Sequence, residues 1–228
     1  MPVFTRTKDL IELAEIKDRE RLYVITDKLS VRVLLEGGNL QIFQQENNGL
    51  NPLNHQTGPP FGLSLDNTLK YEYEFVDQEN YKVLILSAES LQVPGLLVKK
   101  HLKFIPGANE VEYWITYTNI HKTAKHASAR TSAGFGGISL NPYSAKGFAY
   151  TPIGGKVIES DSITNFLTDP LLPTSPEFWS ETWTAVQGLM SGDYSAWIWK
   201  PDNIGKVKLR QGSLSQLESK TIEIEPNE

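Results

Sequence analysis

Apolar and polar residues alternate with a period of two between Leu69 and Asn119, and this alternation restricts the fold more than any other feature of the chain. Successive side chains of a β-strand point to opposite faces, so an alternating run gives a strand one apolar and one polar face. Four such runs are separated by short turns, as at residues 77–80 and 106–109. Because connections this short join antiparallel neighbours, residues 69–119 are predicted to form a four-stranded meander.

Similar runs lie before and after this segment. Residues 22–26 and 30–36 flank Asp27-Lys28 as a predicted hairpin, and a further strand is expected after Gly37-Gly38. Later predicted strands cover residues 183–187, 194–200, 206–210 and 221–225. The chain is therefore predicted to be all-β, a large antiparallel β-sandwich with few or no helices.

Two segments depart from the alternating pattern. Residues 8–21 have helical spacing, although a short strand over residues 10–16 fits as well. Residues 134–180 have little periodicity and many Gly, Pro and Ser residues, which is typical of a functional loop region that covers a sheet. β-Sandwiches of this size form single domains, so residues 1–228 are predicted to be one domain. A domain excised from a longer chain would have the same sequence features.

Composition excludes several classes of function. A net charge of -5 argues against a nucleic-acid surface, and the basic run Lys99-Lys100-His101 with Lys103 is interpreted as the solvated face of a strand. No apolar run is long enough to span a bilayer, so no membrane contact is expected. The amino end lacks the apolar stretch of a secretory signal, which favours the cytoplasm. With no cysteine and no metal-binding spacing of histidines or carboxylates, neither a metal nor a cofactor is expected.

The order of segments resembles a known family. Residues 23–54 contain a strand, the Gly37-Gly38 turn, a second strand and a loop, and residues 101–119 contain a strand pair that ends in Asn119. This order resembles the galactose mutarotase-like β-supersandwich, a family that includes aldose 1-epimerases and accessory domains of glycoside hydrolases. The resemblance implies a supersandwich fold and an association with carbohydrates.

The catalytic residues of the epimerases are not matched. In that family a His in an Asn-His motif acts as general acid and a late Glu acts as general base. The only Asn-His pair here, Asn54-His55, stands where an earlier family His falls, and no such motif follows Asn119. Glu218 lies in a terminal run interpreted as an edge strand and tail. The resemblance therefore implies recognition of carbohydrate without a complete catalytic site.

The candidate ligand-binding residues come from two regions. His55 belongs to a polar segment that Pro59-Pro60 stiffens, interpreted as a loop, and loops on a rigid scaffold often carry binding residues. Aromatic residues gather near the carboxyl end, and flat rings beside carboxylates or guanidinium groups suit the apolar faces and hydroxyl edges of sugars. The predicted set is His55, Arg130, Glu177, Trp179, Glu181 and Trp183, whereas Trp197 and Trp199 are assigned to the core.

Three functions are consistent with these residues. The first is a carbohydrate-binding or carbohydrate-processing-associated domain that presents residues 134–183 and the His55 segment at one rim. The second is a diverged aldose 1-epimerase-like enzyme that uses His55 or His126. The third is a structural or oligomerisation module without a small ligand, whose partner is a second copy in a homodimer or a neighbouring domain. A sandwich serves all three, so the fold alone does not select among them.

Overall fold

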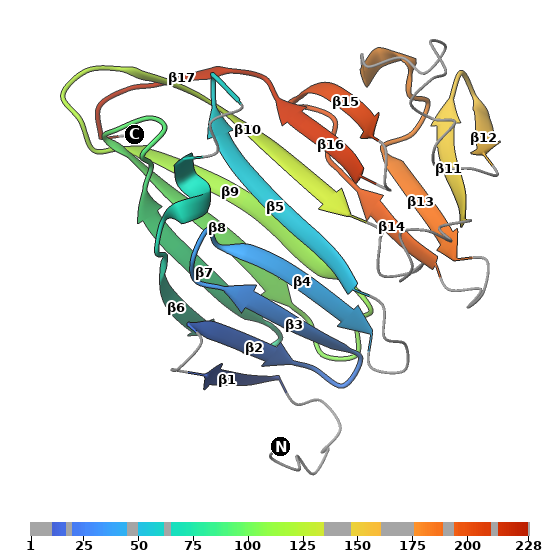
Figure 1. Ribbon diagram of the computed structural model, residues 1–228, viewed down its shortest axis with the longest axis horizontal. Coiled ribbons are helices and arrows are strands. Elements are labelled where there is room, and N and C mark those ends of the chain that lie inside the picture. Colours follow the sequence, from blue (N-terminus) through green and yellow to red (C-terminus); the bar gives the residue numbers. More distant parts are fainter. Residues whose placement is uncertain are drawn as a thin grey trace. The chain divides into compact units, whose positions relative to one another are not determined.

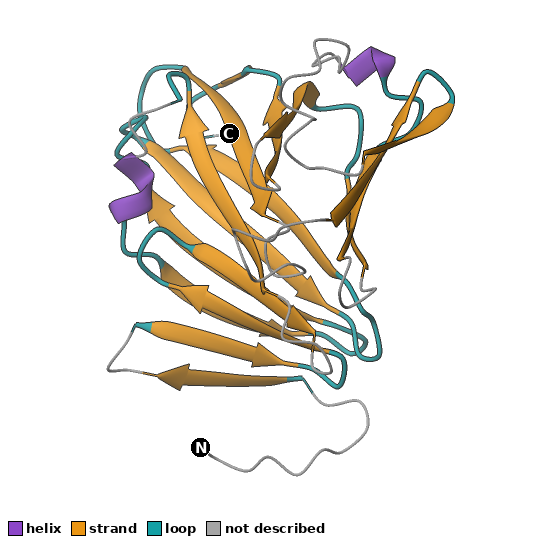
Figure 2. Ribbon diagram, turned by 45° about the vertical axis from the view of Figure 1, so that its right-hand side comes forward, coloured by secondary structure: helices purple, strands orange, loops and turns teal. Residues whose placement is uncertain are grey.

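The computed structural model describes residues 11–16, 20–44, 50–61, 65–134, 147–160, 176–188, 194–210 and 214–227 (Figure 1). These residues form antiparallel β-strands, with two short 3₁₀ turns as the only helical elements described, which confirms the predicted all-β sandwich class (Figure 2). A search of the same residues finds no helix that could cross a membrane.

The chain divides into two compact units. The first unit contains residues 1–47, 62–125 and 223–228, and the second contains residues 48–61 and 126–222. Each unit is therefore assembled from segments that are far apart in the sequence. The prediction that both belong to one domain stays a prediction.

The first unit begins with four consecutive antiparallel strands. Its strands are β1 (Glu12–Ile16), β2 (Arg21–Ile25), β3 (Leu29–Leu34) and β4 (Asn39–Gln44), and they pair in that order. The strand alternative for residues 10–16 is therefore confirmed. Gly37 and Gly38 form the β3–β4 turn with φ of +74° and +56°, values that glycine adopts without steric cost. A Cβ on Gly37 would also lie 2.6 Å from the backbone oxygen of Asn67, so the position has no room for a side chain.

The predicted meander forms the second sheet of this unit (Figure 1). Its strands are β6 (Glu72–Asp77), β7 (Lys82–Glu89), β8 (Leu96–Phe104) and β9 (Val111–Asn119). Along β8 every second side chain from Leu96 to Phe104 is buried, as the alternation requires. The buried face packs the core of the unit, and Lys99, His101 and Lys103 lie on the partly exposed face.

The interpretation of the whole basic run as a solvated face is wrong for Lys100. Lys100 has the same parity as Val98 and Leu102, and its exposed fraction is 0%. The Nζ atom donates hydrogen bonds to the carbonyl oxygens of Gly37 (2.8 Å) and Gly38 (3.2 Å). It also lies 4.4 Å from the centre of the Tyr71 ring. Burial lowers the pKa of Lys100 to about 7, although the nearby Asp66 charge acts in the opposite direction.

A buried carboxylate fixes the loop between β7 and β8. Asp66 belongs to the 3₁₀ turn η2 (Leu65–Thr68) and is 3% exposed. It accepts hydrogen bonds from the hydroxyl of Ser90 (2.8 Å) and from the backbone N–H groups of Leu91 (2.9 Å) and Gln92 (3.1 Å). The contacts join segments about 25 residues apart in sequence. The carboxyl oxygens of Asp66 are therefore satisfied by hydrogen bonds from another loop.

The second unit also contains two antiparallel sheets. In the first, β5 (Leu50–Gly58) pairs with β10 (Lys125–Gly134), β10 pairs with β16 (Leu214–Ser219), and β16 pairs with β15 (Ile204–Arg210). In the second, the order is β12 (Lys156–Ser160), β11 (Gly147–Ile153), β13 (Trp183–Gly188) and β14 (Tyr194–Ile198). The remaining elements are the 3₁₀ turn η4 (Pro176–Phe178) and the short strand β17 (Ile222–Ile224) near the end of the chain.

Two loop interpretations need correction in this unit. The region 134–180, interpreted as loop, contains the β11–β12 hairpin, which turns at Gly154-Gly155. Its residues 135–146 and 161–175 lie outside the described residues. The segment around His55 is strand β5 rather than loop, and the strand ends at Gly58, directly before Pro59-Pro60. Polar residues obscured this strand because they occupy both of its faces, with Asn54 and Gln56 on one and His55 and Thr57 on the other.

Candidate functional site

A polar face forms on the sheet β5–β10–β16–β15 of the second unit. The strand register places Gln56, Arg130, Glu218 and Lys206 in one row, because residues directly opposite each other share a face. The next row contains Asn54, Ser132 and Gln216. Asn54 is exposed, and Gln56, Arg130, Ser132, Glu218 and Lys206 are half-buried. We call these seven residues the polar face.

Arg130 is held at the centre of the polar face by two partners. Its Nη2 donates to Glu218 Oε1 at 3.1 Å, with both side chains about 15% exposed. Its guanidinium carbon lies 4.2 Å from the centre of the Phe61 ring. An aromatic face attracts a guanidinium group, most strongly where water is partly excluded. The Glu218 carboxylate and the Phe61 ring therefore together fix the orientation of the Arg130 guanidinium group.

The Phe61 ring in turn depends on the glycine that ends β5. A Cβ on Gly58 would lie 2.6 Å to 2.9 Å from three atoms of the Phe61 ring, so only glycine leaves room for it. The chain returns from β5 through Pro59-Pro60 to place this ring against Arg130. Gly58, Phe61 and Arg130 thus pack as successive layers.

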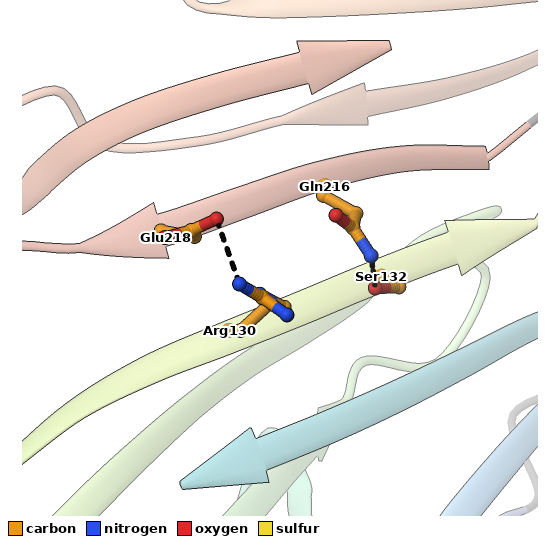
Figure 3. A network of polar contacts seen from close by, with 4 residues as sticks. All are labelled: Arg130, Ser132, Gln216 and Glu218. Atoms are coloured by element: carbon orange, nitrogen blue, oxygen red, sulfur yellow. Dashed lines mark hydrogen bonds and ion pairs between the residues drawn. The ribbon is translucent and has the colours of Figure 1, made fainter. Parts of the chain in front are cut away.

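Gln216 and Ser132 form the second part of the network (Figure 3). Gln216 Nε2 donates to Ser132 Oγ at 3.0 Å, and Gln216 is only 7% exposed. Its Oε1 atom is buried without a hydrogen-bond partner among the described residues, and the same holds for Arg130 Nε. A buried polar atom without a partner is unfavourable by about 1–3 kcal/mol and calls for an explanation, such as a bound ligand or water.

The structure separates the predicted site residues. Arg130 lies on the polar face. His55, on the neighbouring strand β5, lies on the opposite face in a row with Thr131, Leu217 and Val207. All four residues of that row are buried, and His55 is 2% exposed. His55 and Arg130 therefore do not point to the same side of the sheet.

The predicted aromatic residues also divide between core and surface. Trp179 and Trp199 pack edge to face at 5.4 Å within a core cluster that includes Val207 and Leu217. Trp197 packs against that cluster, which agrees with the assignment of Trp197 and Trp199 to the core. By contrast, Trp183 is half-buried, its indole N–H donates to Glu181, and both Glu177 and Glu181 are exposed. Ligand binding by His55, Trp179, Trp183, Glu177 and Glu181 stays a prediction.

Sequence reasoning missed Gln216, Ser132 and Phe61 and misplaced Glu218. Glu218 was expected in an edge strand and tail, but β16 is an internal strand between β10 and β15. Gln216 on the same strand was not predicted, because Leu217 is the only apolar residue between Leu214 and Ile222 and so no alternation is visible. Phe61 was also missed, since a single aromatic residue after two prolines carries no periodic signal.

The polar face has the chemistry of hydrogen bonding rather than of metal binding. Across the part of the chain that the structure describes, no three His, Cys, Asp or Glu side chains group as a metal site. The face instead brings together a guanidinium group on an aromatic ring, a carboxylate and a primary amide. These groups donate to and accept from hydroxyl groups.

Comparison with known proteins identifies a structural relative and no sequence relative. No protein-family model matches the chain, and no curated protein matches it. Among solved structures, the fold is similar to that of the GH36 alpha-galactosidase AgaB from Geobacillus stearothermophilus, with a TM-score of 0.53 and 10% sequence identity. The similarity covers 95% of this chain but only 39% of the AgaB chain. At this identity the comparison shows a shared fold, and the fold is one found in a glycoside hydrolase.

Proposed function

We propose that this protein is a carbohydrate-processing-associated domain that binds a glycan on the polar face of its second unit. The observation that carries the proposal is the pair of buried, unpartnered polar atoms, Arg130 Nε and Gln216 Oε1, on side chains whose other polar atoms bind Glu218 and Ser132. A sugar would supply partners for both atoms. The fold shared with a GH36 alpha-galactosidase supports a carbohydrate rather than another polyhydroxyl ligand.

The composition of the polar face favours binding over catalysis. Proton transfer at a sugar ring uses an acid and a base in reach of each other, most often a His and a carboxylate. The face contains one carboxylate, Glu218, which is ion-paired with Arg130. His55, the closest histidine in sequence to the face, points to the opposite side of the sheet. We therefore propose a binding domain without its own complete catalytic site.

The first test replaces the central residue of the polar face. Arg130→Gln removes the guanidinium group that stacks on Phe61 and reaches Glu218, and we expect the affinity for glycan to fall at least tenfold, or about 1.4 kcal/mol. The measurement is isothermal titration calorimetry with the best ligand from a screen of neutral and acidic oligosaccharides. Lys156→Gln is the matched control, because it removes one positive charge from an exposed strand position of the same unit.

The outcomes separate the proposal from its alternatives. Retention of full affinity by Arg130→Gln, with the Lys156 variant also unchanged, would place the ligand elsewhere and contradict the proposal. A screen in which no oligosaccharide binds to the wild-type protein would contradict glycan binding as such. Catalysed mutarotation of a simple aldose by the wild-type protein would instead support the diverged epimerase.

A further inference from the structure

The unpartnered atoms of the polar face differ in hydrogen-bonding character. Arg130 Nε is a donor, and Gln216 Oε1 is an acceptor. The two residues are diagonal neighbours on paired strands, because Arg130 lies opposite Glu218 and Gln216 lies opposite Ser132. Diagonal neighbours lie about 7–8 Å apart, and their Cβ atoms are somewhat closer. Two adjacent hydroxyl groups of a pyranose, each hydrogen-bonded at about 2.8 Å, can reach polar atoms on two side chains that project from such neighbours.

Only some ligand groups can satisfy both atoms. A hydroxyl group both donates and accepts, so a pair of sugar hydroxyls can accept from Arg130 Nε and donate to Gln216 Oε1. An ionised carboxylate or sulfate only accepts, and it would leave Gln216 Oε1 buried without a donor. In this structure the amide Nε2 donates to Ser132 Oγ, so Oε1 is the atom left to accept.

The charges of the face give a second reason against an anion. The positive charge of Arg130 is already paired with Glu218 at 3.1 Å. In the register Glu218 stands between Arg130 and Lys206, and Lys208 stands opposite Gln216. An anionic group at Arg130 would therefore lie beside an ionised carboxylate in a partly buried site, where repulsion is stronger than in water.

We infer that the polar face selects uncharged sugars through adjacent hydroxyl groups and discriminates against uronic acids and sulfated sugars. The inference rests on the proposed function and names the ligand class of the same site. Arg130 and Gln216 recognise the hydroxyl pair, and Glu218 both orients Arg130 and rejects acidic sugars.

The test compares a neutral sugar with its acidic counterpart. Methyl glucoside and methyl glucuronide, and the corresponding galactose pair, differ only at C6 and are titrated into the protein by ligand-observed NMR. We expect the better neutral glycoside to bind at least tenfold more tightly than its uronate. In Glu218→Gln, which keeps a hydrogen-bond acceptor but removes the charge, the uronate should gain at least fivefold relative to the neutral sugar.

Gln216→Met tests the acceptor with little change in side-chain size. We expect it to weaken the neutral glycoside about tenfold, the loss of roughly one hydrogen bond. Gln78→Met, in the exposed β6–β7 turn of the first unit, is the matched control and should bind like the wild type. Near-ultraviolet circular dichroism of each variant verifies that the fold is retained.

Each outcome decides the inference. Uronates that bind as tightly as neutral glycosides, or more tightly, would overturn the ligand class while leaving glycan binding intact. Unchanged neutral affinity in Gln216→Met would overturn the role of the hydroxyl pair. If neither sugar class binds, and only water forms hydrogen bonds with Arg130 Nε and Gln216 Oε1, the proposed function fails together with this inference.

Discussion

The free energy of unfolding of the first unit should rise by about 1.4 kcal/mol per pH unit between about pH 7 and about pH 9.5. The cause is Lys100, whose pKa burial lowers from its ordinary value of 10.5 to about 7. In this range the unfolded chain binds a proton at Lys100 that the folded protein does not hold. Raising the pH therefore favours the folded state. The stability gained in this way is lost again as the pH falls toward 7.

The surroundings of Lys100 set the upper limit of this range. Burial raises the pKa values of Tyr71 and Tyr113, so both phenols stay protonated in the folded state while the unfolded chain ionises near pH 10. Stability should therefore decline above about pH 10, which leaves a maximum near that value. Asp66 is the nearby carboxylate whose charge favours the protonated amine.

Urea unfolding at a series of pH values, followed by the folded-state amide resonances of β8 and β9, measures this dependence. The variant Lys100→Met keeps the length of the side chain and removes the titrating group, so its stability should be nearly independent of pH between 7 and 9.5. Lys99→Met, on the partly exposed face of the same strand, is the control and should keep the wild-type slope. An equal slope in Lys100→Met would show that another group causes it.

Replacement of Asp66 with alanine should destabilise the first unit by about 3–5 kcal/mol. The substitution leaves the N–H groups of Leu91 and Gln92 and the hydroxyl of Ser90 without their shared acceptor. It also removes a negative charge that favours protonated Lys100. The midpoint of urea unfolding, read at unchanged m-value, measures the loss.

Two further substitutions divide the Asp66 effect into its parts. Both backbone N–H groups donate to Oδ1, which asparagine retains, so Asp66→Asn should lose only about 1–2 kcal/mol. It should also lower the pKa of Lys100 further, because a favourable charge is gone. Ser90→Ala removes one donor and is expected to cost about 1 kcal/mol. Equal losses in Asp66→Asn and Asp66→Ala would contradict a role for the retained hydrogen bonds.

The sequence predicts those strands in which apolar residues are buried and polar residues are exposed. The meander has one apolar and one solvated face, so its alternation is visible from residue 69 to residue 119. Lys100 breaks this pattern, since a lysine occupies a core position and its amine is satisfied by the carbonyls of a turn about 60 residues earlier. That partnership is a product of tertiary structure, and no local pattern contains it.

The candidate site was only partly accessible to prediction for the same reason. Arg130 was predicted because a guanidinium group suits a sugar, but its partners come from β16 and from Phe61, far away in sequence. Strand β16 has the sequence LSQLES, whose two leucines fall on opposite faces among polar residues, so it shows no hydrophobic period. His55 looked like a loop residue because its strand is rich in polar residues and is followed by Pro59-Pro60, whereas the sheet buries it.

The most direct test of glycan binding at the polar face is a crystal structure of the protein with a neutral oligosaccharide that binds in solution. The expected result places two sugar hydroxyls within hydrogen-bond distance of Arg130 Nε and Gln216 Oε1, with the guanidinium group still stacked on Phe61. A sugar bound instead on the half-buried Trp183 beside Glu181, with the polar face filled only by water, would contradict the account.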